Sequence, residues 1–326
     1  MKTSNAVAIR TALRNGEVLE IGRVPRAQAK HSPFQIALGF AAIYLIWGST
    51  YLGIRYAVET IPPLLMMGLR HTTAGILVYG WARSRGAAAP QFRQWGYAAI
   101  AGSFLFLAGH GVLAWAEQKI PSGLAALLCA TLPLWTVLVA RLKGAEQKLS
   151  ARAWFGLVLG FAGVAVLIGP GALRGNGGLN ILGIAAAIAS SLAWAVGTIY
   201  SKNVQTSSSS ILTAAMQMIA GGGLLLLAGF ATGEGLHLAA FSLRSLLALA
   251  YLIVFGSIIA FTVFTWLLTV ASPSRVSTYA YVNPVVAVLL GWALASEAVG
   301  WNTWVATVII MAGVALVSTR SRQDSH

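Results

Sequence analysis

Ionisable side chains inside long apolar stretches are the first chemically informative feature of this sequence. Arg70 and His71 lie within one such stretch, His110 lies within the next, and Glu117 closes it. Because a charged group inside a lipid bilayer is costly, such residues normally face a partner or a water-filled space. These residues are therefore candidates for holding a charge or moving a proton.

Each of these residues has a structural and a chemical interpretation, and both stay open. Arg70 either joins helices, with Glu59, Glu117 or free backbone carbonyls as partner, or attracts the carboxylate of a bound molecule. His110 is either a plain hydrogen-bonded histidine, the more common case, or a proton-responsive gate, since histidine titrates close to neutral pH. Glu117 is the acidic residue placed best for proton-linked chemistry, because all eight acidic residues fall in tails or loops or at the ends of apolar stretches.

A second polar feature is the pair Asn283-Pro284 inside the apolar stretch YAYVNPVVAVLLG. Proline lacks a backbone donor, so Pro284 leaves the carbonyl of Ala280 without its helical partner, and Pro133 has the same effect beside Thr131. A carbonyl freed in lipid must be satisfied by protein, water or ligand. The two prolines therefore predict helix kinks, either sealed by neighbouring helices or presenting polar groups to a shared cavity, and we favour the cavity.

Aromatic side chains form the third candidate group. Tyr44, Trp47 and Tyr51 are spaced three and four residues apart, which places them on one helical face. Many Trp and Tyr residues in such sequences are anchors at the membrane surface, whereas Trp47 and Tyr279 lie deeper, where a hydroxyl or indole N–H needs a partner. The candidate binding residues are Asn283, Trp47, Tyr44, Tyr51, Thr131, Tyr279, Trp194 and Ser257.

The elements that position these residues are predicted to be membrane-spanning helices. The chain is 57% hydrophobic and only 9% charged, with a mean hydropathy of +0.76, so lipid rather than water is its expected solvent. A helix needs about 20 apolar residues to cross the hydrocarbon layer. Ten such spans are expected, at 34–54, 63–82, 95–116, 121–141, 153–169, 180–200, 211–231, 244–268, 274–295 and 301–319.

The distribution of basic residues predicts the orientation. With both termini in the cytoplasm, 17 of the 22 Lys and Arg residues fall on the cytoplasmic side and four outside, while Arg70 lies within a span. This bias is the one expected for short cytoplasmic loops. The net charge of +14 therefore reflects topology, with membrane lipid as the natural counterpart. A nucleic-acid partner is excluded because no folded polar domain carries the basic residues.

The two halves of the chain resemble each other. Trp47–Arg55 aligns with Trp194–Lys202, and Pro133 aligns with Pro284, at shifts close to 150 residues. Five spans per repeat is an odd number, so the second copy enters the membrane inverted. Inverted repeats that meet near the midplane are a transporter architecture. The expected parts are a basic cytoplasmic tail (1–33), a first repeat (34–169), a linker (170–179), a second repeat (180–319) and a cytoplasmic C-terminal tail (320–326).

Other functional classes find little support in the sequence. There is no G-x-x-x-x-G-K-[ST] loop for ATP, and the single cysteine, Cys129, excludes a disulfide framework and a cysteine metal site. No catalytic residue, metal site or cofactor is therefore expected, and the protein is not expected to be an enzyme. A channel remains a rival, although many bulky aromatic residues in the spans argue against it. A monomer is compatible with the sequence.

Three stretches identify a family resemblance: IWGSTY (46–51), PSGLAALLCATLPLWTVL (121–138) and YAYVNPVVAVLLG (279–291). They resemble the EamA-type drug/metabolite transporter (DMT) superfamily and, within it, the YedA-like branch of bacterial inner-membrane exporters. The resemblance implies an all-α membrane protein with ten helices in two inverted five-helix repeats around a central cavity. It also implies efflux of small metabolites, amino acids or their analogues, by a secondary transporter that uses alternating access. Multidrug or organic-cation efflux, or a passive facilitator or channel, is the alternative.

Overall fold

The structure is a computed structural model that describes residues 32–142, 150–173, 180–204, 209–271, 276 and 278–318. The chain divides into Met1–Gln35 and a compact unit, Ile36–His326, which contains every residue of the site described below. The basic N-terminal tail, most of the expected linker and the C-terminal tail lie outside the described residues. The described residues form helices and short turns, and none of them forms a β-strand.

Ten spanning segments follow one another along the described chain, as the sequence predicts. They are α2 (Pro33–Ala57), α3 (Pro63–Ser84), α4–η1–α5 (Phe92–Gly102, Ser103–Gly111, Val112–Glu117), α6–α7 (Ser122–Cys129, Leu132–Leu142), α8 (Ala151–Leu173), α9 (Ile181–Asn203), α10 (Ser210–Ala231), α11–η3–α12 (Leu243–Tyr251, Leu252–Ile259, Ala260–Val270), α14 (Tyr279–Ala295) and α15 (Trp301–Ser318). A short 3₁₀ turn, η2 (Leu238–Ala240), precedes α11.

Length and composition support membrane insertion of these segments. Six described segments are long and apolar enough to cross a membrane, namely α2, α4–α5, α6–α7, α9, α10 and α11–α12. The segments α8, α14 and α15 contribute shorter apolar helices. The remaining segment, α3, belongs to neither group and carries Arg70 and His71. The protein is therefore an all-α multi-pass membrane protein.

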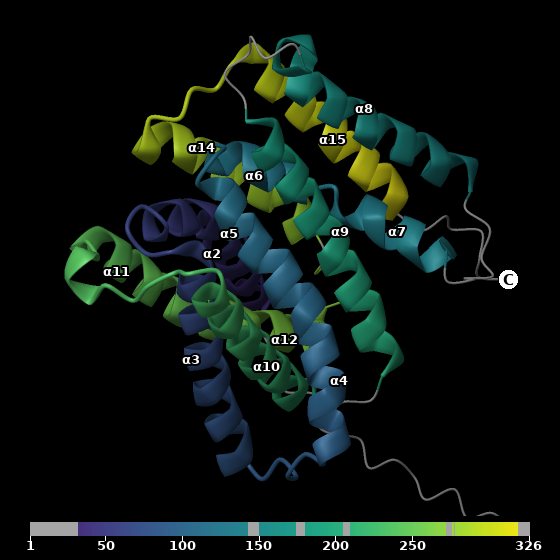
Figure 1. The fold of residues 1–326 in the computed structure, drawn as a ribbon. Coiled ribbons are helices and arrows are strands. Elements are labelled where there is room, and N and C mark those ends of the chain that lie inside the picture. The colour runs from purple at the N-terminus through teal and green to yellow at the C-terminus, as the bar shows by residue number, and fades with distance from the viewer. Residues whose placement is uncertain are drawn as a thin grey trace, which may run out of the picture. The chain divides into compact units, whose positions relative to one another are not determined.

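Equivalent helices of the two repeats pack against each other. The second segment, α3, lies along the seventh, α10; the fifth, α8, lies along the tenth, α15; and α6 of the fourth contacts α14, the ninth. Figure 1 shows α8 and α15 side by side. Pairing between equivalent helices is the arrangement that a two-fold axis between inverted repeats produces. The fold is thus two inverted five-helix repeats, as the sequence predicts.

Glycine allows the closest of these helix contacts. A Cβ atom on Gly102 of α4 would lie 2.8 Å from the backbone nitrogen of Gly221 in α10, and one on Gly313 of α15 would lie 2.5 Å from that of Gly160 in α8. Small residues let backbones approach in lipid, where packing rather than hydrophobic transfer holds helices together. Any larger side chain at these positions would separate the helix pairs.

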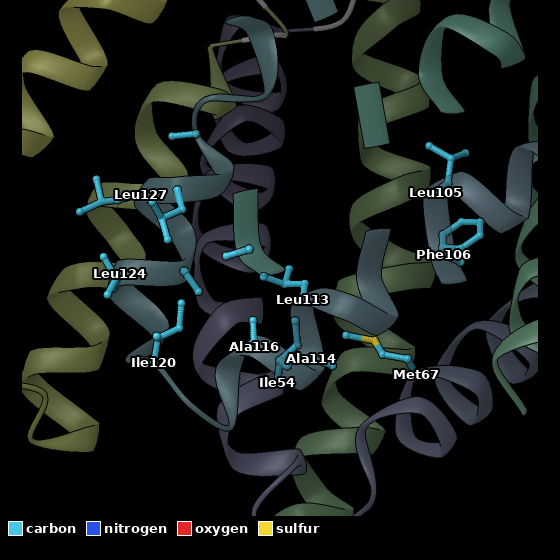
Figure 2. Close-up of a cluster of buried hydrophobic side chains, with 14 of the residues drawn as sticks. Ile54, Met67, Leu105, Phe106, Leu113, Ala114, Ala116, Ile120, Leu124 and Leu127 are labelled. Carbon is cyan, nitrogen blue, oxygen red and sulfur yellow. The ribbon is translucent and has the colours of Figure 1, made fainter. Parts of the chain in front are cut away.

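The packed interior combines side chains from several segments of the first repeat. In Figure 2, Ile54 of α2, Met67 of α3 and Leu113 of α5 lie near one another, while Leu124 and Leu127 of α6 lie further along the same cluster. The cluster also includes Leu105 and Phe106 of η1 (Figure 2). This packing fixes the positions of α2, α3 and η1, the three elements that carry most of the candidate residues of the first repeat.

Candidate functional site

Side chains from both repeats line a cavity of about 420 Å³. Eight of the residues selected from the sequence lie in its wall: Trp47, Tyr51, Arg70, His110, Trp194, Ser257, Tyr279 and Asn283. They come from six different spanning segments, namely α2, α3, the η1 and η3 segments, α9 and α14. The cavity size falls within the range of small-molecule pockets, so the fold gathers these scattered residues around a space that fits one small solute.

One part of the wall is an aromatic cluster formed by Trp47, Phe264 and Tyr279. The ring centroid of Trp47 lies 5.2 Å from that of Phe264 and 4.9 Å from that of Tyr279. The Trp47 indole Nε1 donates a hydrogen bond of 3.1 Å to the carbonyl oxygen of Gly256. The sequence predicts that Trp47 lies deep in its span and that its indole N–H needs a partner, and the structure agrees with this prediction. Phe264 was not singled out, because a Phe in an apolar span carries no distinguishing signal.

Asn283 lies beside this cluster and is buried. With its amide oriented to satisfy its surroundings, the side-chain nitrogen donates to the carbonyl oxygens of Tyr279 at 3.1 Å and Tyr44 at 3.3 Å. The bond to Tyr279 lies within α14, whereas the bond to Tyr44 joins α14 to α2, and these helices belong to different repeats. Asn283 therefore both lines the cavity and holds two of its walls together.

A second part of the wall is a histidine cluster formed by His71, His110, Phe106 and Trp194. The Nε2 atom of His71 and the Nδ1 atom of His110 are 2.8 Å apart and share a hydrogen bond. The two imidazole rings stack at 19°, while Phe106 lies against His71 and Trp194 against His110, with centroid separations of 4.3 Å and 4.4 Å. The other ring nitrogen of His71, Nδ1, has no hydrogen-bond partner among the described residues.

The histidine pair shows what sequence reasoning missed. The sequence indicates His71 only as a neighbour of Arg70, and its pairing with His110, 39 positions away, depends on how α3 packs against η1. The sequence interpretation of His110 as a hydrogen-bonded histidine agrees with the structure. Its alternative, a proton-responsive gate, stays a prediction.

Arg70 is 4% exposed and lines the cavity. Its Nε donates to the hydroxyl of Ser257 at 3.0 Å, and a Cβ atom on Gly256 would come within 3.2 Å of its Nη2. Glu59, one of the partners that the sequence suggested, is wrong in that role, because it forms an ion pair of 3.5 Å with Arg244. The guanidinium therefore meets a neutral hydroxyl and a glycine backbone instead of a carboxylate.

Two π-helical segments place these groups in the wall. The η1 segment carries Phe106 and His110, and the η3 segment, at the equivalent place in the second repeat, carries Gly256 and Ser257. A π-helical turn widens the helix, weakens its internal bonding pattern and is frequent at functional sites. Here it presents the Gly256 carbonyl and the Ser257 hydroxyl to Trp47 and Arg70. Neither segment has a sequence signal that distinguishes it from an ordinary α-helix.

The sequence as a whole matches a model of the EamA-like transporter family at residues 35–169 and again at 181–319. The chain belongs to the EamA-like transporter family. It is 40% identical over 280 residues to the uncharacterized inner membrane transporter YedA of Escherichia coli (strain K12), covering 85% of this chain and 88% of that protein.

More distant relatives agree with this assignment. The chain is 25% identical to the uncharacterized transporter YvbV of Bacillus subtilis (strain 168), covering 88% of this chain and 92% of that protein. It is 24% identical to the protein PagO of Salmonella typhimurium, covering 89% and 97%. A crystal structure with 21% sequence identity superposes with a TM-score of 0.60 over 88% of this chain and 98% of its own. That structure shows a shared fold.

In this EamA-like protein, Glu117 lies outside the cavity wall. Its side chain is fully buried at the end of α5, and neither carboxylate oxygen has a hydrogen-bond partner among the described residues. Its backbone carbonyl oxygen accepts a bond of 2.7 Å from Nη1 of Arg55. An unpartnered buried carboxylate is costly when ionised, so its part in proton-linked chemistry stays a prediction.

The structure places Thr131 and Tyr44 away from the cavity wall. The Thr131 hydroxyl donates to the carbonyl of Leu128 at 2.5 Å and accepts from Nε1 of Trp135 at 3.2 Å. The Tyr44 hydroxyl meets the Thr278 hydroxyl at 2.5 Å. Both residues have their hydrogen bonds satisfied by nearby protein groups, so the structure gives them a bracing role.

The two prolines have different structural consequences. Pro133 follows an interruption between α6 and α7, which end and begin at Cys129 and Leu132. Pro284 lies inside the continuous helix α14. Pro133 lies in the first turn of α7, where its missing N–H interrupts no helical bond, whereas Pro284 removes one inside α14. Asn283 and Cys129, each near one of the prolines, line the cavity. No group of three His, Cys, Asp or Glu residues that could hold a metal ion occurs in the described part of the chain.

Proposed function

We propose that this protein is a secondary transporter of the bacterial inner membrane that exports small metabolites, amino acids or their analogues, by alternating access. The observation that carries the proposal is the cavity between the two repeats, with aromatic rings in one part of its wall and Arg70 and paired histidines in another. Such a wall suits a small solute with an apolar body and a charged or polar group. Both termini are cytoplasmic in this proposal, following the distribution of basic residues.

Hydrogen bonds at one end of the bundle support alternating access. At that end α2, α5 and α14 finish while α6 and α11 begin. Four bonds of 2.7 Å join these elements: Arg55 Nη1 to the Glu117 carbonyl, Tyr56 Oη to the Leu294 carbonyl, Ser245 Oγ to the Tyr56 carbonyl and Ser122 N to the Glu297 carboxylate. The charge distribution predicts that this is the outer end. A small set of polar bonds across helix ends can break and re-form while the apolar packing inside each repeat persists.

The alternatives fit the cavity less well. Efflux of organic cations would bring a positive charge next to Arg70, and none of the described lining residues is Asp or Glu. A channel would need an open path, whereas the wall carries bulky rings such as Trp47, Phe106 and Trp194. Catalysis would need a nucleophile with an activating base or a bound metal, and family membership favours a transporter over an enzyme.

Counterflow in proteoliposomes, without a proton gradient, tests the proposal. Neutral amino acids form one panel and lipophilic cations the other, with Asn283→Ala and Trp47→Ala beside the wild type. Trp292→Ala is the matched control, because that side chain is 62% exposed on the apolar surface. Amino-acid exchange that is weakened in the two cavity variants, more in Trp47→Ala than in Asn283→Ala, and unchanged in the control supports the proposal. Exchange of cations alone, or single-channel conductance in a planar bilayer, contradicts it.

A further inference from the structure

We infer that the cavity selects organic monoanions, solutes with one carboxylate, an apolar body and no compensating ammonium group. The inference rests on the proposed transport function and, among the proposed amino acids and analogues, favours the analogues that lack an ammonium group.

The charge of Arg70 has no counter-ion among the described residues. Its contacts are the Ser257 hydroxyl at 3.0 Å and the sulfur of Met67 at 3.9 Å, and it forms no ion pair within the described chain. A guanidinium carries five N–H donors in a planar fork that matches a carboxylate. A buried charge without a counter-ion is strongly unfavourable. A carboxylate that enters the cavity would therefore supply the counter-ion that the Arg70 guanidinium lacks.

The ionisable groups around Arg70 do not supply the missing negative charge. His71 and His110 share a hydrogen bond, so together they are either neutral or carry a positive charge. Glu117 and Tyr251 are the other titratable groups that interact electrostatically with Arg70, and neither forms an ion pair with it. Glu117 lies outside the cavity wall and forms no ion pair with a described residue. A bound carboxylate would thus meet the positive charge of Arg70 with no Asp or Glu beside it among the described lining residues.

An ammonium group would find no carboxylate in the same wall. The described lining residues include no Asp or Glu. The acceptors that do line it, such as the hydroxyls of Ser190 and Ser191, are neutral. Ring faces such as those of Trp47 and Tyr279 attract a cation weakly compared with a carboxylate. A zwitterion would therefore gain at Arg70 and lose where its ammonium is desolvated.

The rest of the wall is suited to an apolar body. The aromatic cluster of Trp47, Phe264 and Tyr279 lines the cavity together with Phe106 and Trp194. A cavity of about 420 Å³ can hold one aryl or branched alkyl group with a carboxylate. A single guanidinium matches one carboxylate.

A matched set of ligands tests the inference on the purified protein in detergent. 3-Phenylpropionate, phenylalanine and phenethylamine share one ring and differ only in carrying a carboxylate, both groups or an ammonium. 4-Methylpentanoate, leucine and isoamylamine form the matching aliphatic set. Binding is followed by quenching of tryptophan fluorescence, since Trp47 and Trp194 line the cavity, and by the shift in thermal unfolding temperature. We expect the carboxylate of each set to bind about tenfold tighter than the zwitterion, the scale of one favourable charge contact, and the amines not to bind.

Variants assign the effect to Arg70. Arg70→Gln should remove the preference for the carboxylate, and Arg70→Lys should keep part of it, since the charge remains while the planar fork is lost. Glu117→Gln should leave the order of the three ligands unchanged. A large gain in carboxylate affinity in Glu117→Gln would show that Glu117 compensates Arg70, which overturns the inference.

The outcomes separate this inference from the proposed function. Tighter binding of phenylalanine or leucine than of the matching carboxylate overturns the inference, as does the absence of binding by both carboxylates. If zwitterions are also exchanged in proteoliposomes, the proposed function stands without it. If the carboxylates bind through Arg70 but no ligand is exchanged, the transport proposal fails and the charge selectivity stands. The order of the three wild-type affinities decides the question even if Arg70→Gln fails to fold.

Discussion

The aromatic cluster and the histidine cluster occupy equivalent places in the two repeats but present different chemistry. Each contains a tryptophan from the first helix of its repeat, Trp47 in α2 and Trp194 in α9, aligned by the internal repeat. Trp47 donates a hydrogen bond to Gly256 and contacts two rings. Trp194 lies against His110 and Phe106. The repeats thus share the position of a tryptophan in their first helix. The side chains around each tryptophan determine what its part of the wall can bind.

The two π-helical segments likewise have equivalent positions in the repeats but carry different side chains. Both η1 and η3 lie at the centre of a spanning segment and both reach the cavity. In the first repeat this position supplies His110, and in the second it supplies Ser257, which accepts a bond from Arg70. The inverted duplication places a polar group at each position, and substitution has made the two groups different. An asymmetric solute can therefore bind in one orientation.

Truncating the two tryptophans should give the largest contrast. Trp47→Ala removes two ring contacts and a hydrogen bond, a loss of about 2–4 kcal/mol, whereas Trp194→Ala removes ring contacts alone, about 1–2 kcal/mol. Counterflow rates should fall about tenfold or more for Trp47→Ala and less for Trp194→Ala. Equal losses would mean that the two clusters contribute alike to binding. Trp292→Ala, on the exposed surface, should leave the rate unchanged.

The histidine pair should behave as a coupled unit. In a double-mutant cycle of His71→Ala and His110→Ala, the coupling energy should be about 1 kcal/mol, the usual size of one hydrogen bond, because each single change leaves a buried nitrogen without its partner. Thermal unfolding in detergent measures it. His237→Ala, at an exposed position, should show no coupling to His110→Ala. Additive effects within the pair would contradict the hydrogen bond.

Asn283→Ala should have a smaller effect that falls on the aromatic part of the wall. It removes the donor to the carbonyl oxygens of Tyr279 and Tyr44, which should cost about 1–2 kcal/mol and raise the half-saturation concentration severalfold. Concentration dependence of counterflow measures this change. Asn302→Ala, at an exposed position, is the control. An unchanged half-saturation concentration would assign Asn283 to neither binding nor bracing.

The smallest and sharpest contrast comes from replacing each tryptophan by phenylalanine. Trp47→Phe keeps a ring and loses the bond to Gly256, so affinity should fall about fivefold, corresponding to about 1 kcal/mol. Trp194→Phe should change affinity by less than about twofold, because the Trp194 indole N–H forms no hydrogen bond to a described residue in this structure and only ring contacts remain to be perturbed. Titration by fluorescence, using the cavity tryptophan that remains in each variant, compares the two. A larger loss of affinity in Trp194→Phe than in Trp47→Phe would contradict the prediction that the hydrogen bond of Trp47 contributes to binding.

The sequence by itself determined that lipid is the solvent, the ten spans, the inverted duplication and eight residues of the cavity wall. Hydropathy and the positions of Gly and Pro report directly which segments lie in lipid, and each predicted span corresponds to a helix or a helix series in the structure. Depth within a span also selected Trp47, Tyr279 and Asn283. These features depend on the local chain, where periodicity and composition carry the information.

Only the tertiary structure decided which polar groups meet. Three features depend on how separate helices pack. His71 pairs with His110, and Arg70 contacts Ser257 rather than an acidic residue. Thr131 and Tyr44 form hydrogen bonds to neighbouring groups and do not line the cavity. The π-helical turns that aim Gly256 and Ser257 at their partners depend on helix packing as well. Each contact joins residues far apart in sequence, and the rotation of each helix is set by packing against its neighbours. A single sequence gives the period of a helix but not that rotation.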